Sequence, residues 1–254
     1  MAEVHLFSNG TLTREDAQVV QEFPLVLRVN DQELVTLIAS PHDLRFLVAG
    51  FLRVQGFVSS VDDFLMLSVC NDFGIANVRI RGEVSANLKP ILTSGCGTGI
   101  TFSLPGAGTL QKVAHADQIT PGAVFGLMEQ LARKAEKYKS HGGVHSAAVG
   151  DADGDLLLYA EDIGRHNTVD RLAGEALLRG VDLFGKLLVT SGRVSAEMAA
   201  KAAALGIVLI ASRTSPTDMA IRICQEAGIT LIGYLKGARF NVYANPQLLQ
   251  IESV

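Results

Sequence analysis

The sequence predicts an α/β protein, with a smaller α+β unit at residues 1–118 and a layered α/β domain at residues 119–254. Two observations predict the second domain. Helical patterns alternate with short apolar runs three times after residue 165, which is the order of elements in α/β layers. These runs are continuous, as in parallel strands that helices cover on both faces. We therefore expect a three-layer domain around a mixed sheet.

The first unit is predicted from short strands and one helix. Residues 23–30 and 33–40 flank a two-residue polar turn and predict a hairpin. Ser40 is the expected N-cap of a helix whose first turn contains Pro41. Further strands are expected at residues 65–69 and 76–82.

The second domain follows in a regular order. Thr120 and Pro121 predict the start of a helix. Two strands joined by a turn are expected next, and then three helix–strand units. The strands are expected at residues 142–150, 155–163, 186–192, 207–214 and 229–237, and the helices of the three units at residues 166–180, 195–206 and 216–228. Ser215 and Pro216 predict the start of the third of these helices.

The composition limits the classes of function. The chain has 254 residues, of which 48% are hydrophobic and 19% charged, and a formal net charge of −4. Such a chain can bury a core, and its charge argues against a general nucleic-acid surface. Three cysteines without a CxxC pair favour a reducing compartment. The start lacks the pattern of a signal peptide and no apolar run could cross a bilayer, so we expect a cytoplasmic protein.

Cys96 is the first candidate functional residue. It lies among Gly95, Gly97 and Gly99. A glycine cluster usually marks a loop that needs positive φ or a close approach of the backbone to another group. The cysteine could be exposed there, beside backbone N–H groups that face an anion. The alternative is a tight turn that carries a small hydrophobic residue.

Other candidates lie where strands lead into helices, at the edge of the sheet where ligands usually bind. Residues 161–167 crowd two acids, an arginine, a histidine and an asparagine around a glycine. Backbone amides and Arg165 could bind an anion there, and His166 could move protons. The alternative is ordinary capping, with Asn167 as the N-cap and the acids paired to Arg165.

Three further segments carry weaker signals. Ser191 and Arg193 could bind a second anion, although Ser195 and Glu197 also fit a simple helix start. The final segment places two cations around a glycine, which suits a diphosphate, or forms a solvated turn. His141 and His145 straddle two glycines instead of sharing a helix face, so a metal site is disfavoured.

Seven segments of the chain resemble the formate dehydrogenase accessory sulfurtransferases, the FdhD family. They follow the order of the family and are spread over nearly the whole chain. The segments are EFPLVLRVN, TSGCGTG, GGVHSAA, EDIGRHNTVDRL, TSGRVSAEMAAKAAALGI, SPTDMAI and GYLKGARFNVYAN.

The resemblance implies a sulfurtransferase activity and its partners. Family members accept sulfur from a cysteine desulfurase as a cysteine persulfide. They pass it to a bis(molybdopterin guanine dinucleotide) molybdenum cofactor before that cofactor enters formate dehydrogenase. The persulfide cysteine matches Cys96. The cofactor-binding stretch matches Tyr234, Leu235, Lys236, Gly237, Ala238 and Arg239, and we expect further cofactor contacts at Arg165, His166, Asn167, Ser191 and Arg193.

The resemblance also implies a cytidine deaminase-like second domain and a homodimer. Zinc deaminases bind their metal with His-x-Glu and Pro-Cys-x-x-Cys segments at two helix starts. The corresponding starts, residues 165–167 and 191–193, contain no cysteine. We therefore expect neither zinc nor deamination.

One departure from the family pattern concerns the cysteine loop. Many members carry Cys-x-x-Cys there, whereas Gly99 stands at the second position. A disulfide within the loop is therefore excluded, and Cys224 is expected to be structural because it lies among apolar helix residues. Two alternatives stay open: a cofactor-binding chaperone that moves no sulfur, and a nucleotide-modifying enzyme of deaminase ancestry.

Overall fold

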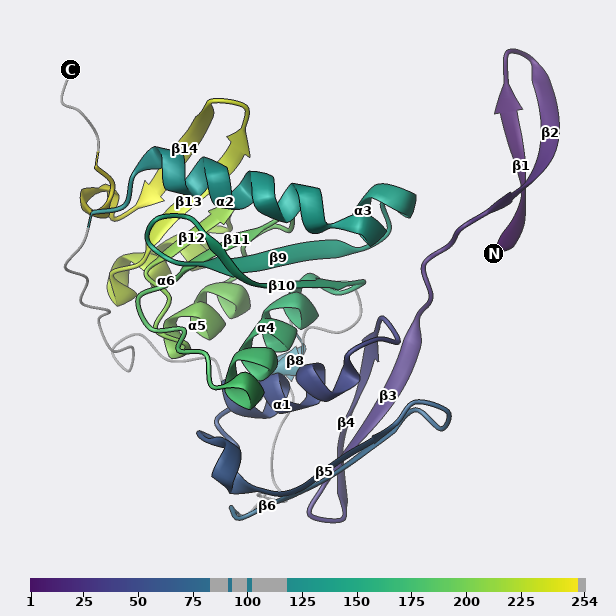
Figure 1. Cartoon of the computed structure of the whole chain (residues 1–254), viewed down its shortest axis with the longest axis horizontal. Coiled ribbons are helices and arrows are strands. Elements are labelled where there is room, and N and C mark those ends of the chain that lie inside the picture. Colours follow the sequence, from purple (N-terminus) through teal and green to yellow (C-terminus); the bar gives the residue numbers. More distant parts are fainter. Residues whose placement is uncertain (83–90, 93–99, 102–117, 251–254) are drawn as a thin grey trace.

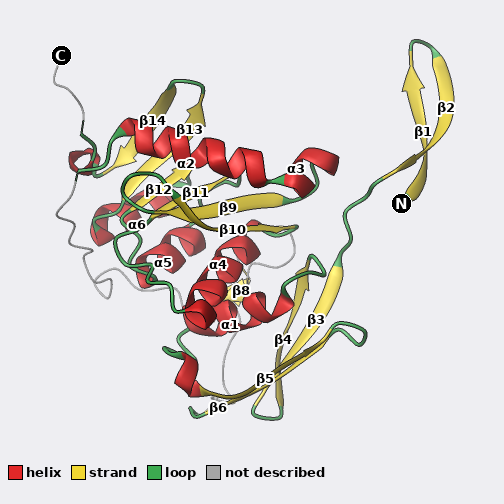
Figure 2. Ribbon diagram, viewed as in Figure 1, coloured by secondary structure: helices red, strands yellow, loops and turns green. Residues whose placement is uncertain are grey.

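The computed structural model describes residues 1–82, 91–92, 100–101 and 118–250. It is a mixed α/β structure whose two larger sheets are each covered by helices (Figures 1 and 2). None of the helices in these ranges is both long and apolar enough to cross a membrane.

The larger sheet has six strands in the order β10-β9-β11-β12-β13-β14. The three central strands β11, β12 and β13 are parallel, and β9, β10 and β14 run antiparallel to their neighbours. Their bounds are β9 His145–Gly150, β10 Leu156–Asp162, β11 Leu187–Thr190, β12 Leu209–Ser212, β13 Thr230–Lys236 and β14 Arg239–Ala244.

Helices cover both faces of this sheet. Leu187 and Val189 pack with α2 on one face, whereas Leu188 packs with α4, α5 and α6 on the other. Because both faces are buried, the strand needs apolar residues at every position, which is why the sequence shows continuous runs. The bounds are α2 Pro121–Lys134, α4 Arg165–Arg179, α5 Ala196–Ala204 and α6 Asp218–Ala227, and α3 Glu136–His141 follows α2.

The smaller sheet has four strands in the order β4-β3-β6-β5, and α1 packs on it. Its strands are β3 Phe23–Val29, β4 Gln32–Ala39, β5 Phe64–Cys70 and β6 Ile75–Ile80, and α1 is Leu44–Val54. Helix α1 also crosses α4, and a Cβ on Gly50 would overlap the carbonyl oxygen of Asp170. Glycine therefore lets the two helices meet at their backbones, which joins the two sheets into one body (Figure 1).

Short elements complete the described chain. The hairpin of β1 and β2 extends away from the rest of the molecule (Figure 1). Their bounds are β1 Ala2–Ser8 and β2 Thr11–Ala17, with β7 Ile91–Leu92, β8 Ile100–Thr101, and the 3₁₀ turns η1 Val61–Asp63 and η2 Pro246–Leu248.

The structure confirms most predicted elements and corrects three helix starts. The N-cap of α1 is Asp43, so the expected cap at Ser40 is wrong. Ser40 instead hydrogen-bonds to the β10–α4 junction. The N-cap of α4 is Gly164, not Asn167, and that of α6 is Thr217, not Ser215. Helix α3, strand β14 and the β1–β2 hairpin were not expected.

The mixed α/β class is thus confirmed. The division of the chain near residue 118 stays a prediction.

Candidate functional site

The carboxyl ends of β11, β12 and β13 meet at one edge of the large sheet, as expected. Ser191 ties this edge to the start of β9, because its Oγ accepts a hydrogen bond from the Ser146 amide at 2.9 Å. The Arg213 amide donates to the Thr190 carbonyl at 3.2 Å. Hydrogen bonds to backbone groups therefore hold the segments at this edge together.

A cavity of about 430 Å³ lies at this edge, between the β12–α6 loop and the β13–β14 hairpin. Its lining residues are Arg213, Tyr234, Lys236, Arg239 and Asn241. All five are exposed. Three of them are cationic and none is acidic, so the cavity suits a ligand with several negative charges.

Tyr234 has a strained backbone within β13. Its φ is 54°, in the left-handed region that bulky residues rarely adopt. The residue sits in an irregular part of the β13–β14 pairing, where its amide donates to the Thr214 carbonyl at 3.0 Å. Its ring is 51% exposed. Strain of this kind concentrates at functional sites, and here it turns an aromatic ring toward the cavity.

The predicted segment from Tyr234 to Arg239 divides into three roles. Tyr234, Lys236 and Arg239 line the cavity. Leu235 is buried and packs in the core under α2. Gly237 has a φ of 60° and forms the hairpin turn with the exposed Ala238.

Two lining residues were absent from the predicted set. Arg213 follows β12 directly, where a strand leads into a helix, but the sequence analysis did not single it out as a candidate. Ser212 fixes the loop, because its Oγ donates to the Gly192 carbonyl at 2.7 Å. Asn241 was missed because β14 was not expected, although residues 239–244 have the apolar alternation of a strand.

The residues at the start of α4 do not line the cavity. Arg165, His166 and Asn167 are all buried. The Asn167 amide donates to the Ile38 carbonyl at 2.9 Å and to Asp162 at 2.8 Å. This part of the predicted site thus connects β4 with the β10–α4 junction.

Asp162 is the centre of that connection and is fully buried. It accepts hydrogen bonds from the Ser40 amide at 3.1 Å and from Arg171 Nη2 at 2.6 Å. Arg171 also donates to the carbonyl oxygens of Ser40 and His42. The charged residues of this junction therefore bind one another and the backbone of the segment between β4 and α1.

His166 belongs to a second buried network. Its Nε2 lies 2.9 Å from Ser195 Oγ, and its Nδ1 lies 3.5 Å from Glu197. Lys201 then bridges Glu197 at 3.0 Å and Asp170 at 2.9 Å. Burial lowers the pKa of His166 to about 3, against the attraction of Glu197. The imidazole is therefore neutral and too weak a base to hold a proton near pH 7.

Ser191 and Arg193 are separated in the structure. Ser191 lines a smaller cavity of about 140 Å³ together with Arg213. Arg193 is exposed and lines neither of these two cavities.

The two histidines of the sequence pair belong to different elements, His141 to the end of α3 and His145 to the start of β9. His145 is half-buried, and burial and then Arg165 lower its pKa. His141 ends α3. Across the residues that the structure describes, no group of three or more His, Cys, Asp or Glu residues could hold a metal ion.

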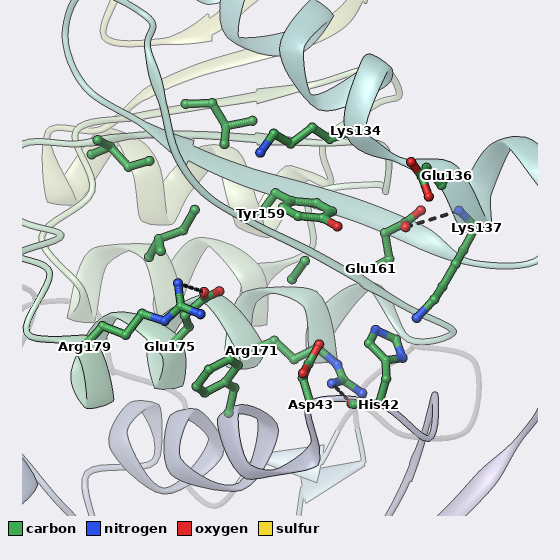
Figure 3. A pocket seen from close by; sticks show the side chains of 15 residues that line it. His42, Asp43, Lys134, Glu136, Lys137, Tyr159, Glu161, Arg171, Glu175 and Arg179 are labelled. Carbon is green, nitrogen blue, oxygen red and sulfur yellow. Dashed lines mark hydrogen bonds and ion pairs between the residues drawn. The ribbon is translucent and has the colours of Figure 1, made fainter.

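A further cavity of about 410 Å³ lies along β10 and between α1, α3 and α4 (Figure 3). It differs from the edge cavity in charge. Its lining includes Asp43, Glu136, Glu161 and Glu175 beside the cations. Arg179 pairs with Glu175 at 2.8 Å. This balanced lining offers less attraction to an anion than a lining that has no acid.

Cys96 lies outside the described residues. Of the other two cysteines, Cys70 is partly exposed and Cys224 is fully buried. Burial raises the pKa of Cys224 to about 12. The complete burial confirms that Cys224 is a core residue. A thiol of such pKa forms almost no thiolate near neutral pH.

The fold and the edge cavity define an α/β protein with a cation-lined recess at the carboxyl ends of its parallel strands. The chain belongs to the FdhD/NarQ family, whose sequence model matches residues 20–250.

Relatives match nearly the full chain. A "Sulfur carrier protein FdhD" of Shouchella clausii is 34% identical and covers 99% of this chain and 97% of its own length. The protein of the same name from Bacillus subtilis is 33% identical, with 98% and 96% covered. A crystal structure from Desulfotalea psychrophila, described as a formate dehydrogenase accessory protein, has a TM-score of 0.80 and 25% identity, and covers 98% of both chains.

Proposed function

We propose that this protein is a sulfurtransferase for the maturation of formate dehydrogenase. It accepts persulfide sulfur from a cysteine desulfurase on Cys96. It then transfers the sulfur to a bis(molybdopterin guanine dinucleotide) molybdenum cofactor, which is its substrate. The observation that carries the proposal is the cavity where Arg213, Lys236 and Arg239 gather without an acid, on a chain of the FdhD/NarQ family.

The edge cavity supports the docking of the cofactor by its guanine dinucleotide ends. The diphosphate of a dinucleotide carries two negative charges, which suit the guanidinium and ammonium groups of the lining. The exposed ring of Tyr234 adds a flat surface, and Asn241 adds amide donors and an acceptor. Arg165, His166 and Asn167 lie outside the lining of this cavity, and the contacts of His166 and Asn167 hold the start of α4 in place.

The transfer of sulfur to Cys96 needs one thiolate that attacks and another that leaves. The Cys96 thiolate attacks the outer sulfur of the desulfurase persulfide, a new S–S bond forms, and the desulfurase cysteine leaves as a thiolate. Gly99 replaces the second cysteine of related loops. The sulfur therefore stays on Cys96 until a cofactor accepts it.

The compartment, the oligomeric state and the recipient of the cofactor belong to the same proposal. The protein acts in the cytoplasm, as a homodimer, with formate dehydrogenase as the recipient of the cofactor. The proposal also includes a cytidine deaminase-like second domain, in which α4 and α5 correspond to the two helices whose starts bind zinc in deaminases. Residues 165–167 and 191–193 supply no cysteine there, so zinc plays no part.

Mass spectrometry tests the sulfur step. Wild type and Cys70→Ala are incubated with a cysteine desulfurase and cysteine, and the Cys96 peptide is analysed before and after reduction. We expect one additional sulfur atom on this peptide in both proteins, lost on reduction, and none in Cys96→Ala. No added sulfur on Cys96, although the desulfurase itself is charged, would contradict the carrier role and favour a chaperone that only binds the cofactor.

A further inference from the structure

The loop that carries Arg213 is held by one buried hydroxyl group, that of Ser212 at the end of β12. Ser212 is fully buried, and its Oγ donates to the Gly192 carbonyl at 2.7 Å. The same oxygen lies 3.0 Å from the Thr214 amide nitrogen and 3.1 Å from Thr214 Oγ1. A hydroxyl group has one proton to donate and two lone pairs that accept. Because the proton goes to Gly192, both groups of Thr214 donate to Ser212, and the hydroxyl group is fully satisfied.

Thr214 connects this hydroxyl group to the neighbouring strand β13. Its carbonyl accepts a hydrogen bond from the Tyr234 amide at 3.0 Å. The same carbonyl oxygen would lie only 3.1 Å from a Cβ at Gly233, so the two segments are in close contact. Tyr234 has a positive φ, and such a backbone persists only where its surroundings fix it. The contact between Ser212 and Thr214 therefore helps to hold the Tyr234 ring at the edge cavity.

Arg213 lies between Ser212 and Thr214 in the chain and is also fixed by β11. Its amide donates to the Thr190 carbonyl at 3.2 Å. Arg213 and Tyr234 line the edge cavity. Ser212 and Thr214 lie outside the lining of this cavity and of the 140 Å³ cavity beside it. Any effect of the two hydroxyl groups on a ligand therefore acts through their neighbours.

We infer that Ser212 is a positioning residue of the edge cavity, whose hydroxyl group holds both Arg213 and Tyr234 in the geometry that binds a diphosphate. This inference rests on the proposed function. Side chains that are already held in place lose less freedom when a ligand binds, so a preformed site binds more tightly. Without the hydroxyl group, the Arg213 loop and the Tyr234 backbone must be ordered by the ligand itself.

Calorimetric titration of the full chain with inorganic pyrophosphate tests this role. Ser212→Ala should weaken binding by about tenfold, because two lining side chains must then be ordered on binding. Thr230→Val is the matched control for stability. Thr230 is also fully buried, and its Oγ1 donates to the Asn245 carbonyl at 2.7 Å, at the start of β13 and away from the cavity. This control should lose stability like Ser212→Ala and bind pyrophosphate like wild type.

A double-mutant cycle distinguishes positioning from a general structural role. In the Arg213→Ala background, Ser212→Ala should weaken pyrophosphate binding by only about threefold or less, since Tyr234 alone is left to be positioned. A general loosening of the fold would weaken binding by the same factor in both backgrounds.

Thr214 provides a second pair of variants, which keeps the test decisive if Ser212→Ala does not fold. Thr214→Val removes the hydroxyl group that donates to Ser212 and should weaken pyrophosphate binding by about threefold. Thr214→Ser keeps that group and should bind like wild type.

Three results would overturn the positioning role while the proposed docking of a diphosphate stands. They are equal factors in the two backgrounds, equal weakening by Ser212→Ala and Thr230→Val, and equal binding by the two Thr214 variants. If wild type does not bind pyrophosphate, the docking proposed for the cofactor is itself wrong, and the positioning role is wrong with it.

Discussion

The start of α4 and the edge cavity are both rich in charged residues, but they use them differently. At the start of α4, Asp162 is fully buried, and Arg171 binds it and two carbonyl groups of the segment between β4 and α1. At the edge cavity, Arg213, Lys236 and Arg239 are exposed and gather without an acid. The density of charge in the sequence is thus a poor guide to a binding site. Exposure and the absence of a nearby counter-charge distinguish the cavity.

This contrast predicts that variants at the two regions change different properties. Variants at the start of α4 should change stability, because breaking a buried ion pair leaves an uncompensated charge. Variants of the three cations at the cavity should change ligand affinity and leave stability almost unchanged.

Asp162→Ala should have the largest effect on stability. It leaves the buried Arg171 guanidinium without its carboxylate, so the free energy of unfolding should fall by about 3–5 kcal/mol. Urea denaturation followed by circular dichroism measures this change. The exposed Asp72→Ala variant is the control and should stay within about 0.5 kcal/mol of wild type. Equal effects of the two variants would show that the junction is not held by this pair.

His166→Gln should alter the dependence of stability on pH. In the unfolded chain histidine takes up a proton below a pKa of about 6.5, whereas burial lowers the pKa of folded His166 to about 3. The unfolded state therefore binds more protons between these values, and stability falls as the pH falls through this window.

Between pH 7 and pH 5, wild type should lose about 2 kcal/mol more than His166→Gln. Denaturation at both pH values provides the comparison. Burial raises the pKa of Asp170 to about 6. This residue is present in both proteins and contributes to the change of stability with pH in both. An equal loss of stability in wild type and variant would mean that His166 is solvated and is not part of the buried network.

Variants of Tyr234 should show a smaller effect on stability, which tests the backbone strain at this residue. Because its φ is positive, Tyr234→Gly should be more stable than Tyr234→Ala by about 1 kcal/mol. At Asn241 in β14 the order should reverse, since glycine weakens an ordinary strand position. Thermal unfolding of the four variants measures both differences. The same order at both positions would contradict the strain assigned to Tyr234.

The sequence predicted the elements whose signals are local. The helix–strand units appear as apolar runs between caps, and the edge that they form follows from parallel strand order. The burial of the α4 start was not predictable in the same way. The partners of Asn167 and Asp162 are Ile38 and Ser40, more than 120 residues earlier in the chain. No pattern within residues 161–167 indicates those contacts.

The sequence predicted only part of the cavity lining, because the lining residues come from more than one segment. Lys236 and Arg239 flank a glycine in one hairpin, which the sequence displays directly. Arg213 comes from another loop and joins them only because β12 lies next to β13. Asn241 lies in β14, and a solvated turn around Gly237, the alternative for this segment, does not predict a strand that begins at Arg239.

One measurement tests the central claim, that the edge cavity binds the diphosphate of the cofactor. GDP is titrated by calorimetry into wild type, into the triple variant Arg213→Ala, Lys236→Ala, Arg239→Ala, and into the exposed control Arg222→Ala on α6. Each lost charge-assisted hydrogen bond contributes about 1.5–3 kcal/mol. The triple variant should therefore bind GDP at least about a hundredfold more weakly, and Arg222→Ala should bind it like wild type. GDP binding of equal strength in all three proteins would contradict the assignment of the cavity.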